Sequence, residues 1–300
     1  MTGKSKGFVF ETGTGTFEAD LDEVRRMADG GDPDGLYAMG MACLFGMGVE
    51  QDAEKGFRLL EAASEKGQPA AMTLLVRMFM SNSYMMATET AVDYSRKGAE
   101  AGLSDGQLFL GIAYRDGVGV DRDYKRAAEL FRESARQGNA EARNSLAHIY
   151  QEGLGVDKDP VKAFKLYKNA ASAGNVNAQY QTGACYEAGN GVKTDLKKAA
   201  EWYTMAAEQG DSFAMERLGI LYGLVDPPVD PELSFKWFLD AALQGMLGAM
   251  YYVGVYHLEG FGVDKDVEEG MKWLRLASSS GSGEAAALIS HLEKKGDGHA

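Results

Sequence analysis

The sequence predicts an all-α fold, a solenoid of about seven stacked helix pairs, and three observations lead to this prediction. Two successive blocks of small and apolar residues follow helical spacing in each unit, and an aspartate precedes most second blocks. A fixed period of 35 or 36 residues separates the units, which is typical of a solenoid. The glycines that mark this period are Gly67, Gly102, Gly138, Gly174, Gly210, Gly245 and Gly281.

The first helix of the unit is clearest in residues 178–188. Small or apolar residues stand four, five and eight positions after Ala178, which places them on one face of a helix. Gly189 and Gly191 follow, and glycine accepts the left-handed backbone that ends many helices. We therefore predict a helix that stops at this pair of glycines.

The second helix of the unit is predicted to begin after Asp195. An aspartate side chain at this point accepts the unpaired amide protons of the first turn and meets the positive end of the helix dipole. Two other units have Asp159-Pro160 and Asp230-Pro231 at the same place, and proline is well tolerated at the first helical position. The aspartates therefore mark the starts of the second helices.

The second helices carry a stripe of alanines and large apolar residues that we assign to the core. Neither helix of a pair can bury its stripe alone, so successive pairs must stack. The large residues of this stripe are Leu130, Phe131, Tyr167, Trp202, Tyr203, Trp237, Phe238 and Trp273.

The full pattern of the unit reads A-x-x-x-L-G-x-x-Y-x-x-G-x-G-V-x-x-D-x-x-K-A-x-x-W-Y-x-x-A-A-x-x-G. It resembles the Sel1-like repeat, a relative of the tetratricopeptide repeat, and it covers nearly the whole chain. The resemblance implies a right-handed α/α superhelix of helix-pair repeats. Its best copies are residues 106–138, 142–174, 178–210 and 249–281.

The domain boundaries follow from this pattern. Residues 1–16 are rich in glycine and threonine and are predicted to form a mostly disordered tail, whereas residues 17–300 form the repeat domain. Single helices at 20–31 and 284–295 are predicted to cap the two ends. The predicted repeats are 35–67, 71–102, 106–138, 142–174, 178–210, 214–245 and 249–281.

Two repeats depart from the pattern. Repeat 71–102 lacks the loop glycines and the capping aspartate, so we expect it to be the least regular. Its Met85 and Met86 either fill a core that has lost its tyrosine or form an adaptable contact patch for a partner. Repeat 214–245 has two prolines where the others have glycines, which predicts a stiffer turn.

Composition limits the classes of partner. The net charge of −13 and the pI near 4.9 argue against binding to a phosphate backbone, which requires clustered lysine and arginine. No run of about 18 apolar residues is present, and residues 1–19 contain no apolar signal core, so we expect neither a membrane span nor a secretory signal. The sequence therefore predicts a cytoplasmic protein that does not bind nucleic acid and has no membrane span.

The residues that could carry catalysis or bind a metal are few. Cys43 and Cys185 lie in distant repeats, so an intrachain disulfide is not expected, and no histidine or cysteine has the spacing of a metal ligand set. We predict no metal, no cofactor and no catalytic residue. His148 and Glu152 stand four apart on one helix and are either a base with its orienting acid or, as we favour, a surface pair.

The first helices contain positions that the repeat pattern leaves free. By analogy with tetratricopeptide arrays, the third, seventh, tenth and eleventh positions of these helices line a concave groove. Aromatic, amide and charged groups dominate these positions, a mixture suited to peptide recognition. The predicted groove residues are Tyr37, Met41, Phe45, Arg77, Met80, Arg115, Asp116, Asn144, His148, Gln151, Glu152, Tyr180, Glu187, Glu216, Tyr251 and Glu259.

The hypothesis from sequence is a non-enzymatic scaffold that holds a peptide or protein segment in this groove. Its glutamates, Glu152, Glu187 and Glu259, would favour a basic segment. The alternative comes from the resemblance, because some cysteine-rich Sel1-like proteins are linked to penicillin binding or β-lactam hydrolysis. This chain has only two cysteines, which departs from that type.

Overall fold

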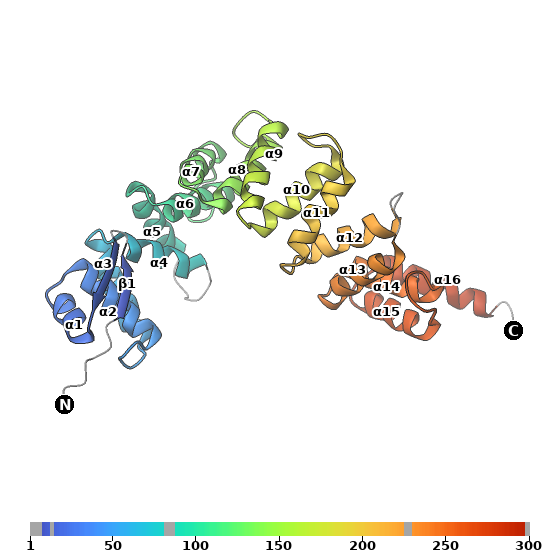
Figure 1. Ribbon diagram of the computed structural model, residues 1–300, viewed down its shortest axis with the longest axis horizontal. Coiled ribbons are helices and arrows are strands. Elements are labelled where there is room, and N and C mark those ends of the chain that lie inside the picture. The colour runs from blue at the N-terminus through green and yellow to red at the C-terminus, as the bar shows by residue number, and fades with distance from the viewer. Residues whose placement is uncertain (1–7, 13–14, 81–87, 225–229, 298–300) are drawn as a thin grey trace. The chain divides into compact units, whose positions relative to one another are not determined.

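The computed structural model describes residues 8–12, 15–80, 88–224 and 230–297. In these parts the chain forms sixteen α-helices and two β-strands (Figure 1). The chain divides into two compact units, Met1–Lys158 and Asp159–Ala300, and each is described by itself.

The first unit contains the two strands and eight helices, and each helix packs against the next one along the chain. Its elements are β1 (Phe8–Thr12), β2 (Gly15–Ala19), α1 (Leu21–Asp29), α2 (Pro33–Phe45), α3 (Ala53–Glu65), α4 (Pro69–Met80), α5 (Thr88–Glu100), α6 (Ser104–Asp116), α7 (Tyr124–Arg136) and α8 (Ala140–Glu152).

The second unit contains the other eight helices, which again pack in chain order. They are α9 (Pro160–Ser172), α10 (Val176–Ala188), α11 (Leu196–Ala207), α12 (Ser212–Leu224), α13 (Pro231–Leu243), α14 (Leu247–Glu259), α15 (Val267–Ser279) and α16 (Gly283–Asp297). Helix α1 precedes the first helix pair, and α16 follows the last one.

The amino-terminal segment differs from the prediction of a mostly disordered tail. Strands β1 and β2 pair antiparallel in the register Phe8↔Ala19 to Thr12↔Gly15. The prediction is wrong for residues 8–12 and 15–16 because it weighed the glycines and threonines and overlooked the aromatic and β-branched residues in Phe8–Thr12, which favour strands. A two-stranded hairpin thus precedes the helices.

The predicted helix starts are confirmed by side-chain caps. Asp159, Asp195 and Asp230 each accept a hydrogen bond from the backbone N–H three residues later, at 2.9 to 3.1 Å. The predicted stop is confirmed as well, because Gly189 and Gly191 have φ values of 72° and 71°. The unusual turns of the second and sixth repeats, with Met85 and Met86 in the former, lie outside the described residues.

The core contact of a repeat joins a glycine in the first helix to a large side chain in the second. A Cβ atom added to Gly111, Gly183 or Gly219 would lie 2.7 Å from the ring of Phe131, Tyr203 or Phe238, respectively. These three rings are at most 1% exposed. Glycine at these three positions lets the second helix lay a ring directly on the first.

The predicted aromatic core is confirmed at this position of the second helix, and it is corrected at the tryptophans. Phe131, Tyr167, Tyr203 and Phe238 are buried, whereas the tryptophans and Leu130 are only partly buried and pack at the edge of the apolar clusters. The tryptophans, which precede the fully buried position by one residue, are Trp202, Trp237 and Trp273.

We predict opposite effects for two helical glycine-to-alanine substitutions. Gly183→Ala should lower the free energy of unfolding by about 1 to 3 kcal/mol, because the new methyl group collides with the Tyr203 ring. Gly283→Ala in α16 has open space around it and should raise stability by about 0.4 to 1 kcal/mol. Urea denaturation of both variants measures this. Equal effects would show that the Tyr203 ring can move aside without cost.

Candidate functional site

The predicted groove residues lie on the first helices of the repeats, namely α2, α4, α6 and α8 in the first unit and α10, α12 and α14 in the second. Several are already engaged with neighbouring repeats, and these contacts decide which side chains can meet a partner.

Tyr37 in α2 is a correction to the predicted groove. It is only 8% exposed and lies in a core cluster with Leu60 and Leu75. Leu108, at the same repeat position in α6, is 2% exposed. The third position of the first helix can therefore face the packed neighbour and not solvent, which the helical period alone does not reveal.

The other apolar residues of the predicted groove on α2 and α4 also differ in exposure. Phe45 is exposed, and Met41 is partly buried against the core. The side chain of Met80 lies outside the described residues.

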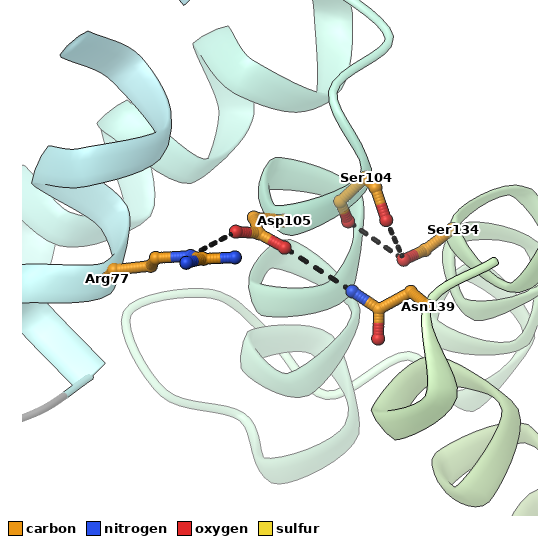
Figure 2. Close-up of polar contacts among 5 residues, drawn as sticks. All are labelled: Arg77, Ser104, Asp105, Ser134 and Asn139. Atoms are coloured by element: carbon orange, nitrogen blue, oxygen red, sulfur yellow. Dashed lines mark hydrogen bonds and ion pairs between the residues drawn. The ribbon is translucent and has the colours of Figure 1, made fainter. Parts of the chain in front are cut away.

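Arg77 joins three successive repeats through Asp105, as Figure 2 shows. Its Nε donates to Oδ2 of Asp105 at 2.6 Å, and Oδ1 of Asp105 accepts from Nδ2 of Asn139 at 3.3 Å. Asn139 in turn caps α8, because its Oδ1 accepts the Ala142 N–H. The Asp105 carboxylate thus holds α4, α6 and the start of α8 together.

A second contact lies beside this carboxylate (Figure 2). The Ser134 hydroxyl in α7 donates to the backbone oxygen of Ser104 at 2.8 Å and lies 2.9 Å from the Ser104 hydroxyl. Arg77 and its surroundings therefore form a structural contact between repeats.

Arg115 and Asp116, both predicted groove residues, pair with each other. The guanidinium donates two hydrogen bonds to the Asp116 carboxylate, at 2.7 and 2.8 Å. This bidentate bond raises the pKa of Arg115 and lowers the pKa of Asp116. The pair presents little net charge to a partner.

Helix α8 carries four predicted groove residues. His148 and Glu152 are exposed, and Gln151 Nε2 lies 3.4 Å from a Glu152 oxygen. The Oδ1 atom of Asn144 is buried without a hydrogen-bond partner among the described residues. His148 and Glu152 accordingly occupy open surface and not an enclosed pocket.

Glu187 in α10 is another correction to the expected electrostatics. Its carboxylate accepts a hydrogen bond from the Tyr203 hydroxyl at 2.7 Å and forms an ion pair with Arg217 of α12. Burial, followed by this hydrogen bond, raises the pKa of Tyr203. Because Arg217 neutralises Glu187, this glutamate is not a free anion that could attract a basic segment.

Helices α10 and α12 of the second unit do bring three side chains together, those of Tyr180, Phe213 and Glu216. The rings of Tyr180 and Phe213 are 6.4 Å apart, and Tyr180 also contacts the Tyr203 ring at 5.5 Å. Glu216 reaches the first turn of α14, where its carboxylate fills the space left by Gly248. Tyr251 follows on α14. We call Tyr180, Phe213, Glu216 and Tyr251 the aromatic face.

Phe213 is the functional candidate that sequence reasoning missed. It is 59% exposed, although it is a large apolar residue. It directly precedes Ala214, which opens the repeat. The matching positions 34, 105, 141 and 177 hold polar residues, and positions 70 and 248 hold alanine and glycine. An aromatic residue at a position that other repeats fill with polar or small residues was the signal that could have revealed it. Glu259, also predicted, is exposed at the end of α14.

In the described parts of the chain, no three histidine, cysteine, aspartate or glutamate side chains lie close enough together to bind a metal ion. Cys43 and Cys185 are both free and buried, and burial raises the pKa of Cys185 to about 11. A hollow of about 580 Å³ lies beside Cys43, lined by Arg25, Asp52 and Lys55 among others. None of the predicted groove residues lines it.

Comparison with known proteins identifies the repeats. The Sel1 repeat family model matches six segments that together cover more than half of the chain. The chain belongs to the Sel1 repeat family. The matched residues are 33–68, 104–139, 140–175, 176–211, 212–246 and 248–282.

The Sel1 matches leave out the repeat that the sequence marks as irregular. Residues 69–103 lie between the first and second matched segments, yet they form the helices α4 and α5. The helix pair is therefore kept although its loop glycines are absent.

Two solved structures resemble the Sel1 solenoid closely. The first is a protective antigen present in uropathogenic Escherichia coli strains that displays an SLR fold; it is 30% identical, with a TM-score of 0.81. The second is a Sel1 repeat protein from Oxalobacter formigenes, 28% identical with a TM-score of 0.72. The match to the first protein covers 92% of this chain and 60% of that protein's length. The match to the second covers 91% of this chain and 80% of that protein's length.

These likenesses confirm the predicted fold class, a helical solenoid of Sel1-like repeats. Among curated proteins, no match to the chain is found. In the described parts of the chain, every helix is too short or too polar to cross a membrane.

We predict that Asp105 contributes more to stability than its partner Arg77. Asp105 is 13% exposed and its loss leaves Asn139 and Arg77 unpaired, so Asp105→Ala should cost about 1 to 3 kcal/mol. Arg77 is 67% exposed, and Arg77→Ala should cost less than about 1 kcal/mol. Denaturant unfolding of both variants and of the double variant measures the coupling. A larger loss for Arg77→Ala would contradict the central role of the carboxylate.

We also predict a pH-dependent effect of Glu216. Burial raises the pKa of Glu216, and Arg217 opposes this shift. The folded state therefore binds the proton more tightly than the unfolded state, so this group loses stability as pH rises through the folded pKa. Glu216→Gln should be more stable than the wild type at pH 7, and the difference should shrink at pH 4. Urea midpoints at both pH values test this. An advantage independent of pH would contradict the shift.

Proposed function

We propose that the chain is a non-enzymatic scaffold that binds a protein segment on the aromatic face. Membership of the Sel1 repeat family supports a role in protein interaction. Repeat solenoids present side chains of successive units on a shared surface, which suits an extended ligand. The proposal places the ligand on α10, α12 and α14 of the second unit.

The observation that carries the proposal is the exposure of Phe213. A phenylalanine ring that is 59% exposed keeps a large apolar surface in water, and its burial by a ligand would be favourable. Tyr180 contacts the Phe213 ring from the preceding repeat and is only partly buried, so a ligand side chain can contact rings from more than one repeat. Binding hot spots are enriched in such aromatic clusters.

The charges around the face indicate the type of segment. Glu187 is neutralised by Arg217, and Glu216 is partly buried against α14 with a raised pKa. Both facts weaken the attraction for a basic ligand that the sequence suggests. We therefore assign a segment with an apolar anchor for Phe213, while Glu216 accepts hydrogen bonds from the ligand.

The hydrolase alternative gains no support from a specific contact among the described residues. His148 and Glu152 are exposed on α8, and Cys185 is buried with a raised pKa, which opposes thiolate formation. We therefore retain the scaffold as the proposed function.

A peptide-display selection tests the proposal directly. The wild-type chain is used to enrich short peptides, and the affinity of the enriched peptides is measured by fluorescence anisotropy. Phe213→Ser should weaken binding about tenfold or more, because the anchor loses its apolar contact. Enriched peptides should also share an apolar residue.

Leu243→Ser provides the matched control. Leu243 is 69% exposed at the end of α13, which is the second helix of its repeat. Its replacement therefore removes a similar exposed apolar area outside the aromatic face. Binding should survive in this variant. If Leu243→Ser and Phe213→Ser weaken binding equally, or if no peptide is enriched, the aromatic face is not the binding surface.

A further inference from the structure

Helix α9 in the second unit has an unusual charge distribution for a chain with a net charge of −13. It contains three lysines and no acidic residue. Lys162, Lys165 and Lys168 are all exposed. A helix with only one sign of charge has no ion pairs between its own side chains. The three lysines therefore do not stabilise α9 through intrahelical ion pairs.

One side of α9 combines charge with an apolar group. Val161, Lys165 and Lys168 stand at positions i, i+4 and i+7, which places them along one side of the helix. Val161 is 51% exposed. This side therefore offers two ammonium groups next to an apolar contact point.

The loop before α11 lies against the first turn of α9 and extends this surface. Gly191, in the loop before α11, touches the backbone of Pro160 so closely that a Cβ atom there would collide with it. The Tyr186 ring meets Phe164 of α9 edge-on at 5.2 Å and lies 5.5 Å from the ammonium of Lys198. The loop and the first turn of α11 bring two more exposed lysines, Lys193 and Lys197.

The acidic residues near this surface do not cancel it. Residues 159–201 contain six lysines and four acidic residues. Asp159 caps α9, and Asp195 caps α11 while pairing with Lys198 at 2.8 Å. Glu187 is paired with Arg217. Of the four acidic residues in this segment, this leaves Glu201, which stands one turn after Lys197.

We propose that Val161, Lys165, Lys168, Lys193 and Lys197, the lysine face, bind an acidic segment of a protein partner. The ammonium groups are exposed point charges that can pair with carboxylates in varied geometry. Exposed Val161 accommodates an apolar residue beside them. This surface belongs to second helices and a loop, and is separate from the aromatic face of the first helices.

An acidic polypeptide fits this surface better than a nucleic acid does. A polynucleotide carries dense charge over a long path and would be repelled by the acidic remainder of the chain. A short acidic segment needs only the local lysines. Complementary charge also speeds encounter and makes binding sensitive to salt.

The test uses a fluorescent deca-glutamate peptide and the full-length chain at low salt. The triple variant Lys165→Glu, Lys168→Glu, Lys197→Glu should lose about tenfold or more in affinity. The control Lys236→Glu, Lys265→Glu, Lys294→Glu changes the net charge equally, at exposed lysines outside the lysine face, and should lose less than about threefold. Circular dichroism and thermal melting confirm that both variants are folded.

The outcomes decide the proposal. A selective loss in the first triple variant, with wild-type affinity in Phe213→Ser, supports an acidic protein ligand on the lysine face. Equal losses in both triple variants would show a nonspecific charge effect and overturn it. Failure of the wild type to bind deca-glutamate would also overturn it, and so would tighter binding of a single-stranded RNA of equal charge.

Discussion

A contact between a first-helix glycine and a second-helix side chain holds five of the repeats together. Phe131, Tyr203 and Phe238 lie directly on Gly111, Gly183 and Gly219, and leucines lie on Gly40 and Gly254 in the same way. Close approach of the two helices excludes water from these side chains, and the alanines of the second helices keep the same spacing to the next repeat. The solenoid depends on this small residue opposite a large one.

The stacking of the repeats also determines which polar side chains can contact a partner. Arg77, Glu187 and Arg217 appear free when the sequence is read one helix at a time, yet each bonds to a different repeat. Such contacts stabilise the interface between repeats. Phe213, by contrast, remains 59% exposed. The surfaces open to a partner are therefore the positions that the stacking contacts do not use.

Much of the fold follows from local sequence signals, and little of the site does. Gly189 and Asp195 predict helix ends because their backbone preferences act within a few residues. The burial of Tyr37 and the pairing of Arg77 with Asp105 depend on a neighbouring repeat, about one period away, and the helical period does not specify that geometry. The pairing of strands Phe8–Thr12 and Gly15–Ala19 does not follow from the composition, because glycine and threonine suit both turns and disordered chain.

The two-sided bonding of Asp105 has a consequence for how such an array can change during evolution. Gln68 donates to Asp34, and Asn139 donates to Asp105, and in both cases the amide caps the helix of the following repeat. Each donor and acceptor therefore belong to adjacent repeats. Duplication or deletion of a single repeat would join a capping amide to a foreign neighbour, so repeats with this bond are expected to be inherited as adjacent pairs and not as interchangeable modules.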